Sequence, residues 1–152
     1  MANTYTQLFV HFVFAVQDRT SLIKSSWKDS LYKYIIAIIN EQGHKPYIIN
    51  GMMDHIHLLV SMNPKQSPSD LMYHIKRSSS KWINSNRLVM GKFTWQEGFG
   101  AFTLDKSQIA SKIDYIKNQQ QHHAKKSFRE EYLEFLKESE VDYDDRYIFR
   151  DV

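Results

Sequence analysis

The chain has 152 residues, of which 42% are hydrophobic and 14% aromatic, which predicts a single domain with a core of its own. It contains no cysteine, which excludes disulfides and thiolate metal sites and fits a reducing cytoplasm. There is no signal-peptide pattern, and no apolar run approaches the roughly 18 residues of a membrane span, so we expect a cytoplasmic protein without membrane contact. The net charge of +3 is compatible with nucleic-acid binding.

Residues 8–16 form the first predicted element. They are almost wholly apolar and β-prone, which predicts a central strand buried on both faces. His11 is the polar exception in this strand. We interpret it as a hydrogen-bonded core residue, with a role near a metal site as the alternative.

A helix and a β-hairpin are predicted next. Apolar residues at helical spacing indicate a helix over about residues 27–42, capped by Ser25 or Ser26. Residues 44–52 and 54–60 then read as two strands joined by a tight turn at Gly51.

The second half of the chain begins with a helix over about residues 68–86, which Ser67 or Ser69 can cap. One face of this helix is basic and rich in hydroxyl groups, which suits contact with phosphates or simply with solvent. Residues 93–104 read as a strand broken by glycines, and helices are expected over residues 105–123 and 128–137.

The order of these elements predicts the fold class. The first six form a βαββαβ unit, so we expect an α+β, ferredoxin-like antiparallel sheet with helices on one face, followed by C-terminal helices. The domain core is expected over about residues 5–124, with a C-terminal helix and an acidic tail over about residues 125–152. Four apolar side chains are expected to pack the tail against the body or a partner subunit: Tyr143, Tyr147, Ile148 and Phe149.

His55 and His57 are the first candidate functional residues. They lie two apart in a predicted strand, so their side chains project from one face, where two imidazoles can hold one metal ion. The alternative is a half-exposed strand whose histidines meet solvent or a neighbouring polar group.

Tyr115, Gln119 and His122 form the second group. They lie at positions i, i+4 and i+7 of the predicted helix over residues 105–123, so they share one helix face. A tyrosine hydroxyl can attack a phosphodiester, and a divalent metal can polarise the phosphate. An amide oxygen one turn after the tyrosine is well placed as a third ligand. The alternative places Tyr115 in ordinary packing and His122 at a favourable helix C-terminus.

Two short patterns and the segment between them carry a family resemblance. His55-Ile56-His57 matches the HUH motif, Tyr115-Ile116-Lys117-Asn118-Gln119 matches the Tyr-x-x-x-Gln helix motif, and the segment Trp95-Gln96-Glu97-Gly98-Phe99-Gly100 lies between them. Together with the chain length and the element order, they resemble the single-tyrosine HUH transposases of the TnpA group, including relatives associated with repeated extragenic palindromes. The resemblance covers nearly the whole chain.

The resemblance implies a mechanism and a set of site residues. Tyr115 would be the nucleophile that cleaves and rejoins single-stranded DNA through a 5′-phosphotyrosine intermediate. His55, His57 and Gln119 would bind Mg²⁺ or Mn²⁺, with His122 as a substitute ligand. Hairpins near the ends of a small mobile element would be the DNA partners, and a homodimer is expected. Contacts to DNA are assigned from helix faces to Lys76, Arg77, Lys81 and Lys117.

Two other functions remain as alternatives. The first is the same chemistry in a domesticated nuclease or nickase that acts on repeated palindromes. The second is a non-catalytic, ferredoxin-like module that binds nucleic acid. Metal-dependent cleavage separates the enzymes from the binding module, which should bind equally well in EDTA and cut nothing.

Overall fold

The sheet has the predicted ferredoxin-like topology. A computed structural model of the chain describes residues 3–20, 22–144, 146 and 148. All strand pairs are antiparallel, and the strands lie in the order β2-β3-β1-β4. Their bounds are β1 (Phe9–Ala15), β2 (Lys45–Gly51), β3 (His55–Ser61) and β4 (Gly100–Leu104).

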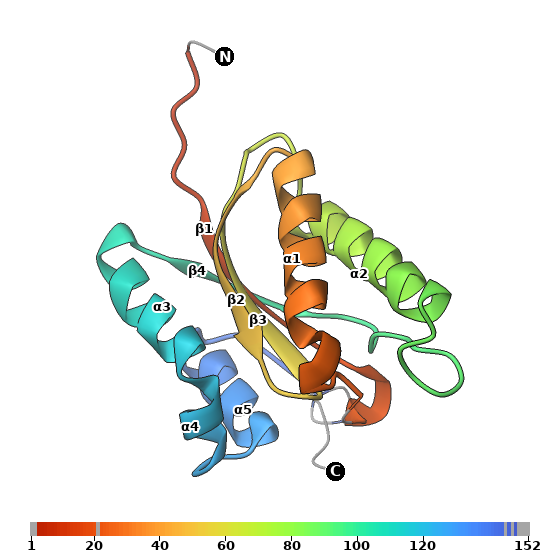
Figure 1. The fold of residues 1–152 in the computed structure, drawn as a ribbon. Helices are drawn as coiled ribbons and strands as arrows, with labels where there is room; N and C mark the ends of the chain where they lie inside the picture. Colours follow the sequence, from red (N-terminus) through yellow and green to blue (C-terminus); the bar gives the residue numbers. More distant parts are fainter. Residues whose placement is uncertain (1–2, 21, 145, 147, 149–152) are drawn as a thin grey trace.

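Helices cover both faces of this sheet (Figure 1). On one face lie α1 (Ser25–Glu41) and α2 (Pro68–Ser85), and on the other lie α3 (Ile109–Lys117), α4 (Gln119–His123) and α5 (Phe128–Glu138). Two 3₁₀ turns, η1 (Gln17–Arg19) and η2 (Lys106–Gln108), connect longer elements. Since the sheet is covered on both sides, all seven residues of β1 are buried, as its apolar sequence predicts.

Two apolar layers separate the sheet from its helices. Alternate residues of β1 and β3, such as Phe12 and Leu58, pack against α1 and α2. The residues between them face the other way, where Val13 and Ala15 pack against Phe128 and Phe135 of α5. Because successive strand residues point to opposite faces, this second layer is also the one that His55 and His57 enter.

None of the helices in the described part of the chain has the length and apolar content needed to cross a bilayer.

Three local predictions were wrong. The first residue before α1 is Lys24, which makes no side-chain cap, so neither Ser25 nor Ser26 is the cap. Of residues 93–104, only Gly100–Leu104 joins the sheet, although Trp95 forms one bridge with Val16. The helix expected over residues 105–123 breaks at Asn118, whose φ and ψ of −102° and 29° are not helical. Local sequence patterns predicted these segments, but contacts with the rest of the fold determine the residues at which each element begins and ends.

The acidic tail is anchored at one described position. Ile148 is buried in the layer between the sheet and α5, whereas Tyr143 is 42% exposed. Tyr147 and Phe149, the other two expected anchors, lie outside the described residues.

Gly51 ends β2 where the chain turns toward His55. A Cβ atom at this position would lie 2.1 Å from the carbonyl oxygen of His55, and that backbone cannot move without breaking the hairpin. We therefore expect Gly51→Ala to lower the free energy of unfolding by at least about 3 kcal/mol, measured by urea denaturation.

Gly91→Ala is the matched control for this substitution. Gly91 has a φ of +73°, but its Cβ would meet no atom within 4 Å, so only backbone strain of about 1 kcal/mol is expected. Equal losses in the two variants would contradict the collision at Gly51.

Candidate active site

His55 and His57 lie side by side on β3, an inner strand of the sheet. Their side chains are buried, with exposures of 1% and 0%. Pairing of β3 with β1 on one side and β2 on the other fixes the backbone beneath both rings. The two imidazoles are therefore held on a rigid support. The alternative prediction, a half-exposed strand whose histidines meet solvent, is wrong because both rings are buried.

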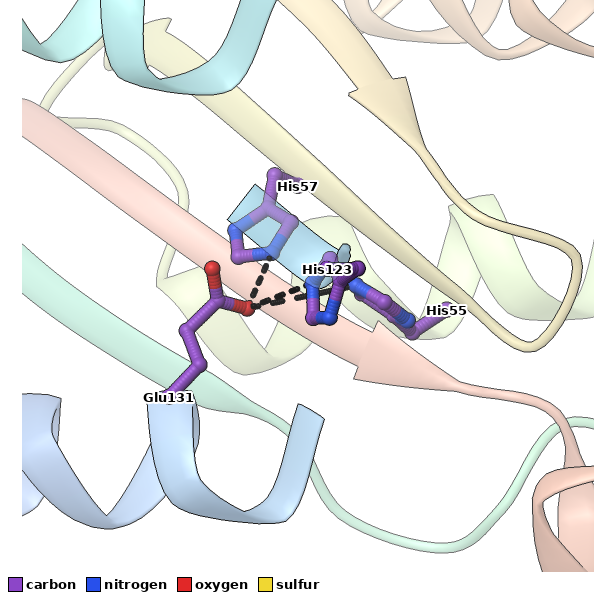
Figure 2. Close-up of side chains that lie close together, drawn as sticks. All are labelled: His55, His57, His123 and Glu131. Atoms are coloured by element: carbon purple, nitrogen blue, oxygen red, sulfur yellow. Dashed lines mark hydrogen bonds and ion pairs between the residues drawn. The ribbon is translucent and has the colours of Figure 1, made fainter. Parts of the chain in front are cut away.

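Two further residues complete a compact cluster with these histidines. His123 comes from α4 and Glu131 from α5, and one ligand atom from each of the four residues lies within 4.8 Å of the others. Glu131 Oε1 lies 2.9 Å from His57 Nε2, 3.3 Å from His123 Nε2 and 3.9 Å from His55 Nε2 (Figure 2). These four residues could hold a metal ion.

Groups behind the cluster orient its imidazoles. His55 Nδ1 lies 2.7 Å from the Asp54 carboxylate, and His123 Nδ1 lies 3.1 Å from the carbonyl oxygen of Lys126. Both of these partners only accept hydrogen bonds, so Nδ1 carries the proton and Nε2 faces the cluster. His57 Nδ1 pairs at 2.8 Å with Nε2 of His11, so the histidine of the first strand supports a residue of the cluster.

Burial dominates the electrostatics of the cluster. It lowers the pKa of His57 well below the usual value, and the neighbouring imidazole of His55 adds to this shift. The pKa of His123 falls to about 4, chiefly through burial. Burial raises the pKa of Glu131 to about 7, against the opposing effect of His55. Without a bound cation, the site therefore disfavours charge on all three groups.

Tyr115 of α3 reaches this cluster with its hydroxyl group, which donates a hydrogen bond to Glu131 Oε2. Its ring stacks on His122, with the ring centroids 4.4 Å apart, and the Lys112 ammonium lies 5.2 Å from the ring centroid. The phenol oxygen is thus held by the carboxylate whose other oxygen faces the three imidazoles. His122 contacts the tyrosine and is not a member of the four-residue cluster.

Gln119 is fully buried at the edge of the cluster. Its Oε1 atom lies 3.3 Å from His55 Nε2 and 3.0 Å from His123 Nε2, while its Nε2 donates to Glu131 Oε2 at 3.1 Å. The structure therefore brings together four of the residues selected from the two sequence patterns: His55, His57, Tyr115 and Gln119.

Asn50 of β2 explains how Tyr115 and Gln119 keep their positions across the helix break. Its Nδ2 donates to the carbonyl oxygens of Ile116 at 2.9 Å and Lys117 at 3.1 Å, which the break leaves without helical partners. Asn50 is paired in register with His57. The end of α3 is thereby attached to the strand pair that carries the histidines.

A family model described as "Transposase IS200 like" matches residues 4–119. The chain belongs to this family of IS200-like transposases. The matched region includes both histidines of β3, Tyr115 and Gln119, and ends before His123 and Glu131.

The chain is also similar to individual proteins and solved structures. The chain is 24% identical over 118 residues to the ISDra2 transposase TnpA of Deinococcus radiodurans, covering 74% of this chain and 84% of that protein. The fold is similar to a crystal structure described as that of a transposase from Deinococcus radiodurans, with a TM-score of 0.61, 21% identity and coverage of 77% of this chain and 94% of that one. It is also similar to a REP-associated tyrosine transposase bound to a REP hairpin, with a TM-score of 0.62, 15% identity and coverage of 80% and 72%.

Sequence reasoning missed two members of the cluster in this IS200-like transposase. His123 follows Gln119 by four residues, the spacing of neighbours on one helix face. Glu131 is a carboxylate on the apolar stripe of α5, three residues after Phe128 and four before Phe135. A charged residue on such a stripe usually has a buried partner, and this was the signal available in the sequence.

The four cations expected to contact DNA do not lie together in the transposase. Lys76, Arg77 and Lys81 belong to α2, which covers the face of the sheet opposite the cluster, whereas Lys117 ends α3 beside it (Figure 1). Arg77 Nη1 donates to the Tyr73 hydroxyl at 3.1 Å.

Lys76 has a role within the protein itself. Its ammonium donates to the carbonyl oxygens of Gln96 at 2.8 Å and Gly98 at 2.5 Å, and burial lowers its pKa to about 8. Trp95 of the same segment donates from Nε1 to the buried Ser79 hydroxyl at 2.9 Å. The segment singled out between the two motifs is therefore fastened to α2.

Proposed function

We propose that this protein cleaves and rejoins single-stranded DNA through a covalent bond to Tyr115, as the transposase of a small mobile element. One observation carries the proposal: the Tyr115 hydroxyl donates to the same carboxylate that faces the histidines of the candidate metal site. A candidate nucleophile and four residues that could hold a metal ion thus lie side by side. Family membership supports the transposase assignment.

The chemistry assigned to Tyr115 is a transesterification. The phenol oxygen bonds to the scissile phosphorus, the bond from phosphorus to the 3′ oxygen breaks, and that oxygen leaves as a 3′-hydroxyl. The product is a 5′-phosphotyrosine, which keeps the energy of the broken bond for rejoining. An unperturbed phenol with a pKa near 10 is ionised in only about one molecule in a thousand at pH 7, so the proton must be drawn away. Glu131 Oε2 already accepts it in a hydrogen bond.

The residues present fit a divalent metal ion. Bound Mg²⁺ or Mn²⁺ would polarise the phosphate and offset the charge that develops on it. His55 and His57 would hold the ion together with the Gln119 amide oxygen. Asp54 and His11 orient the two imidazoles from behind, a second shell that usually raises metal affinity.

The DNA partner that we propose is a single strand with hairpins near the element ends. A REP-associated tyrosine transposase with the same fold binds a REP hairpin, which supports this choice. The Tyr115 hydroxyl contacts Glu131 of the same chain, which supports a tyrosine that acts in its own subunit's site. A homodimer stays a prediction.

The direct test is a trapping assay. Labelled single-stranded DNA carrying the palindromes that flank the protein's own locus is incubated with the protein in Mn²⁺ or in EDTA and run on a denaturing gel. We expect label attached to the protein in Mn²⁺ and none in EDTA. Tight hairpin binding that is equal in EDTA, without any covalent product, would support the non-catalytic binding module instead.

A further inference from the structure

The two motifs supply only part of the polar cluster, and His123 and Glu131 lie outside both. In His55 and His123 the proton is held on Nδ1 by a carboxylate and by a backbone carbonyl, respectively. In its neutral form, each ring therefore presents the lone pair of Nε2 to the centre of the cluster.

These lone pairs face other acceptors. His123 Nε2 lies 3.0 Å from Gln119 Oε1 and 3.3 Å from Glu131 Oε1, and His55 Nε2 lies 3.3 Å from Gln119 Oε1. While Glu131 is ionised, turning the Gln119 amide over does not remove the conflict, because its nitrogen donates to Glu131 Oε2 at 3.1 Å and its oxygen would then face that carboxylate. Acceptors this close repel one another, and a cation between them makes every contact attractive.

The spacing of the atoms also suits a metal ion. Ligands bound at about 2.1 Å lie about 3.0 Å apart in an octahedral shell and about 3.4 Å apart in a tetrahedral one. The distances from Glu131 Oε1 to the three Nε2 atoms are 2.9, 3.3 and 3.9 Å, and those from Gln119 Oε1 to two of them are 3.3 and 3.0 Å. Figure 2 shows the three imidazoles directed at the one carboxylate oxygen.

We propose that His123 and Glu131 join His55, His57 and Gln119 in one five-ligand metal centre that selects a transition-metal ion such as Mn²⁺ or Zn²⁺ over Mg²⁺. Imidazole nitrogen suits first-row transition metals, whereas Mg²⁺ prefers oxygen ligands and retains several waters. Three imidazoles in a buried site therefore disfavour Mg²⁺. This inference deepens the proposed function and rests on it for the role of the ion.

The test measures metal binding without DNA. The protein is stripped with a chelator and titrated calorimetrically with Mn²⁺, Zn²⁺ or Mg²⁺. We expect one site for Mn²⁺ and Zn²⁺, and at least about tenfold weaker binding of Mg²⁺. Glu131→Gln and His123→Ala are each expected to weaken Mn²⁺ binding by about 10- to 100-fold.

Two matched controls come from the same helices. Gln121→Ala removes an exposed side chain of α4, and Glu134→Gln removes an exposed carboxylate of α5, and both variants should bind Mn²⁺ as the unmodified chain does. Circular dichroism checks that each variant is folded, and the partly exposed His123 provides a second reading should Glu131→Gln misfold. Unchanged Mn²⁺ affinity in folded Glu131→Gln and His123→Ala, or Mg²⁺ binding as tight as Mn²⁺ binding, would overturn the inference.

The binding measurement separates this inference from the proposed function. A Tyr115-dependent adduct, together with Mn²⁺ binding that does not depend on His123 and Glu131, would support the proposed function and refute the five-ligand centre. Mn²⁺ binding that depends on His123 and Glu131, with no adduct formed on any flanking hairpin, would support the metal centre and refute the transposition chemistry.

Discussion

Tyr115→Phe is expected to abolish formation of the covalent protein–DNA adduct, a loss of more than about 1,000-fold in the rate of strand cleavage. The substitution removes the only oxygen of the side chain and keeps the ring, whose stacking on His122 should persist. Glu131 Oε2 loses one donor but still accepts from Gln119 Nε2 at 3.1 Å, so the cost in stability should be at most about 1–2 kcal/mol. The measurement is the labelled adduct on a denaturing gel in Mn²⁺.

Two companion measurements make this result specific. Hairpin affinity should be unchanged in Tyr115→Phe, because a lost hydroxyl leaves the rest of the surface intact. Tyr143→Phe, at an exposed tyrosine of the tail, should form the adduct normally. An adduct that survives in Tyr115→Phe would transfer the nucleophile to another residue and refute the assignment.

His57→Ala should have an effect of similar size through the metal site. The imidazole is fully buried, and its Nε2 lies 2.9 Å from Glu131 Oε1, so its removal leaves a cavity and takes a partner from that carboxylate oxygen. We expect Mn²⁺ affinity to fall by about 100-fold or more and adduct formation to be lost. The free energy of unfolding should also fall, by about 2–4 kcal/mol.

The loss of activity must be separated from loss of structure. Far-ultraviolet circular dichroism and the urea midpoint establish that the His57→Ala variant is folded at the assay temperature, and His57→Gln offers a polar replacement of similar size. His74→Ala is the control, because His74 lies on α2 at the far face of the sheet. Normal adduct formation by a folded His57 variant would show that the reaction does not use this imidazole.

The sequence predicted β1, β2 and β3 well because each of these strands has a local signature. The apolar run around β1 and the paired histidines of β3 both depend on residues within a few positions of one another. The fold class is confirmed, and the extra helices are found on the second face of the sheet.

The limits of prediction lie where distant segments meet. At the break before Asn118, Asn50 of β2 donates to backbone carbonyl oxygens of α3, a contact that no helical pattern contains. Glu131 meets His57 only because α5 packs across β1 and β4, so a pattern search near either motif does not reach it. Motifs capture neighbours in sequence, and the remaining cluster residues are neighbours only in space.

The attachment of α3 to β2 has a consequence for any exchange of the tyrosine helix between two copies of the chain. Such a domain swap would first have to break both hydrogen bonds from Asn50 and withdraw the buried Ile116. The incoming helix would then make the same bonds in its new position, so the two arrangements would differ little in free energy. We therefore expect Asn50 to slow the exchange of the tyrosine helix and to have little influence on which arrangement prevails at equilibrium.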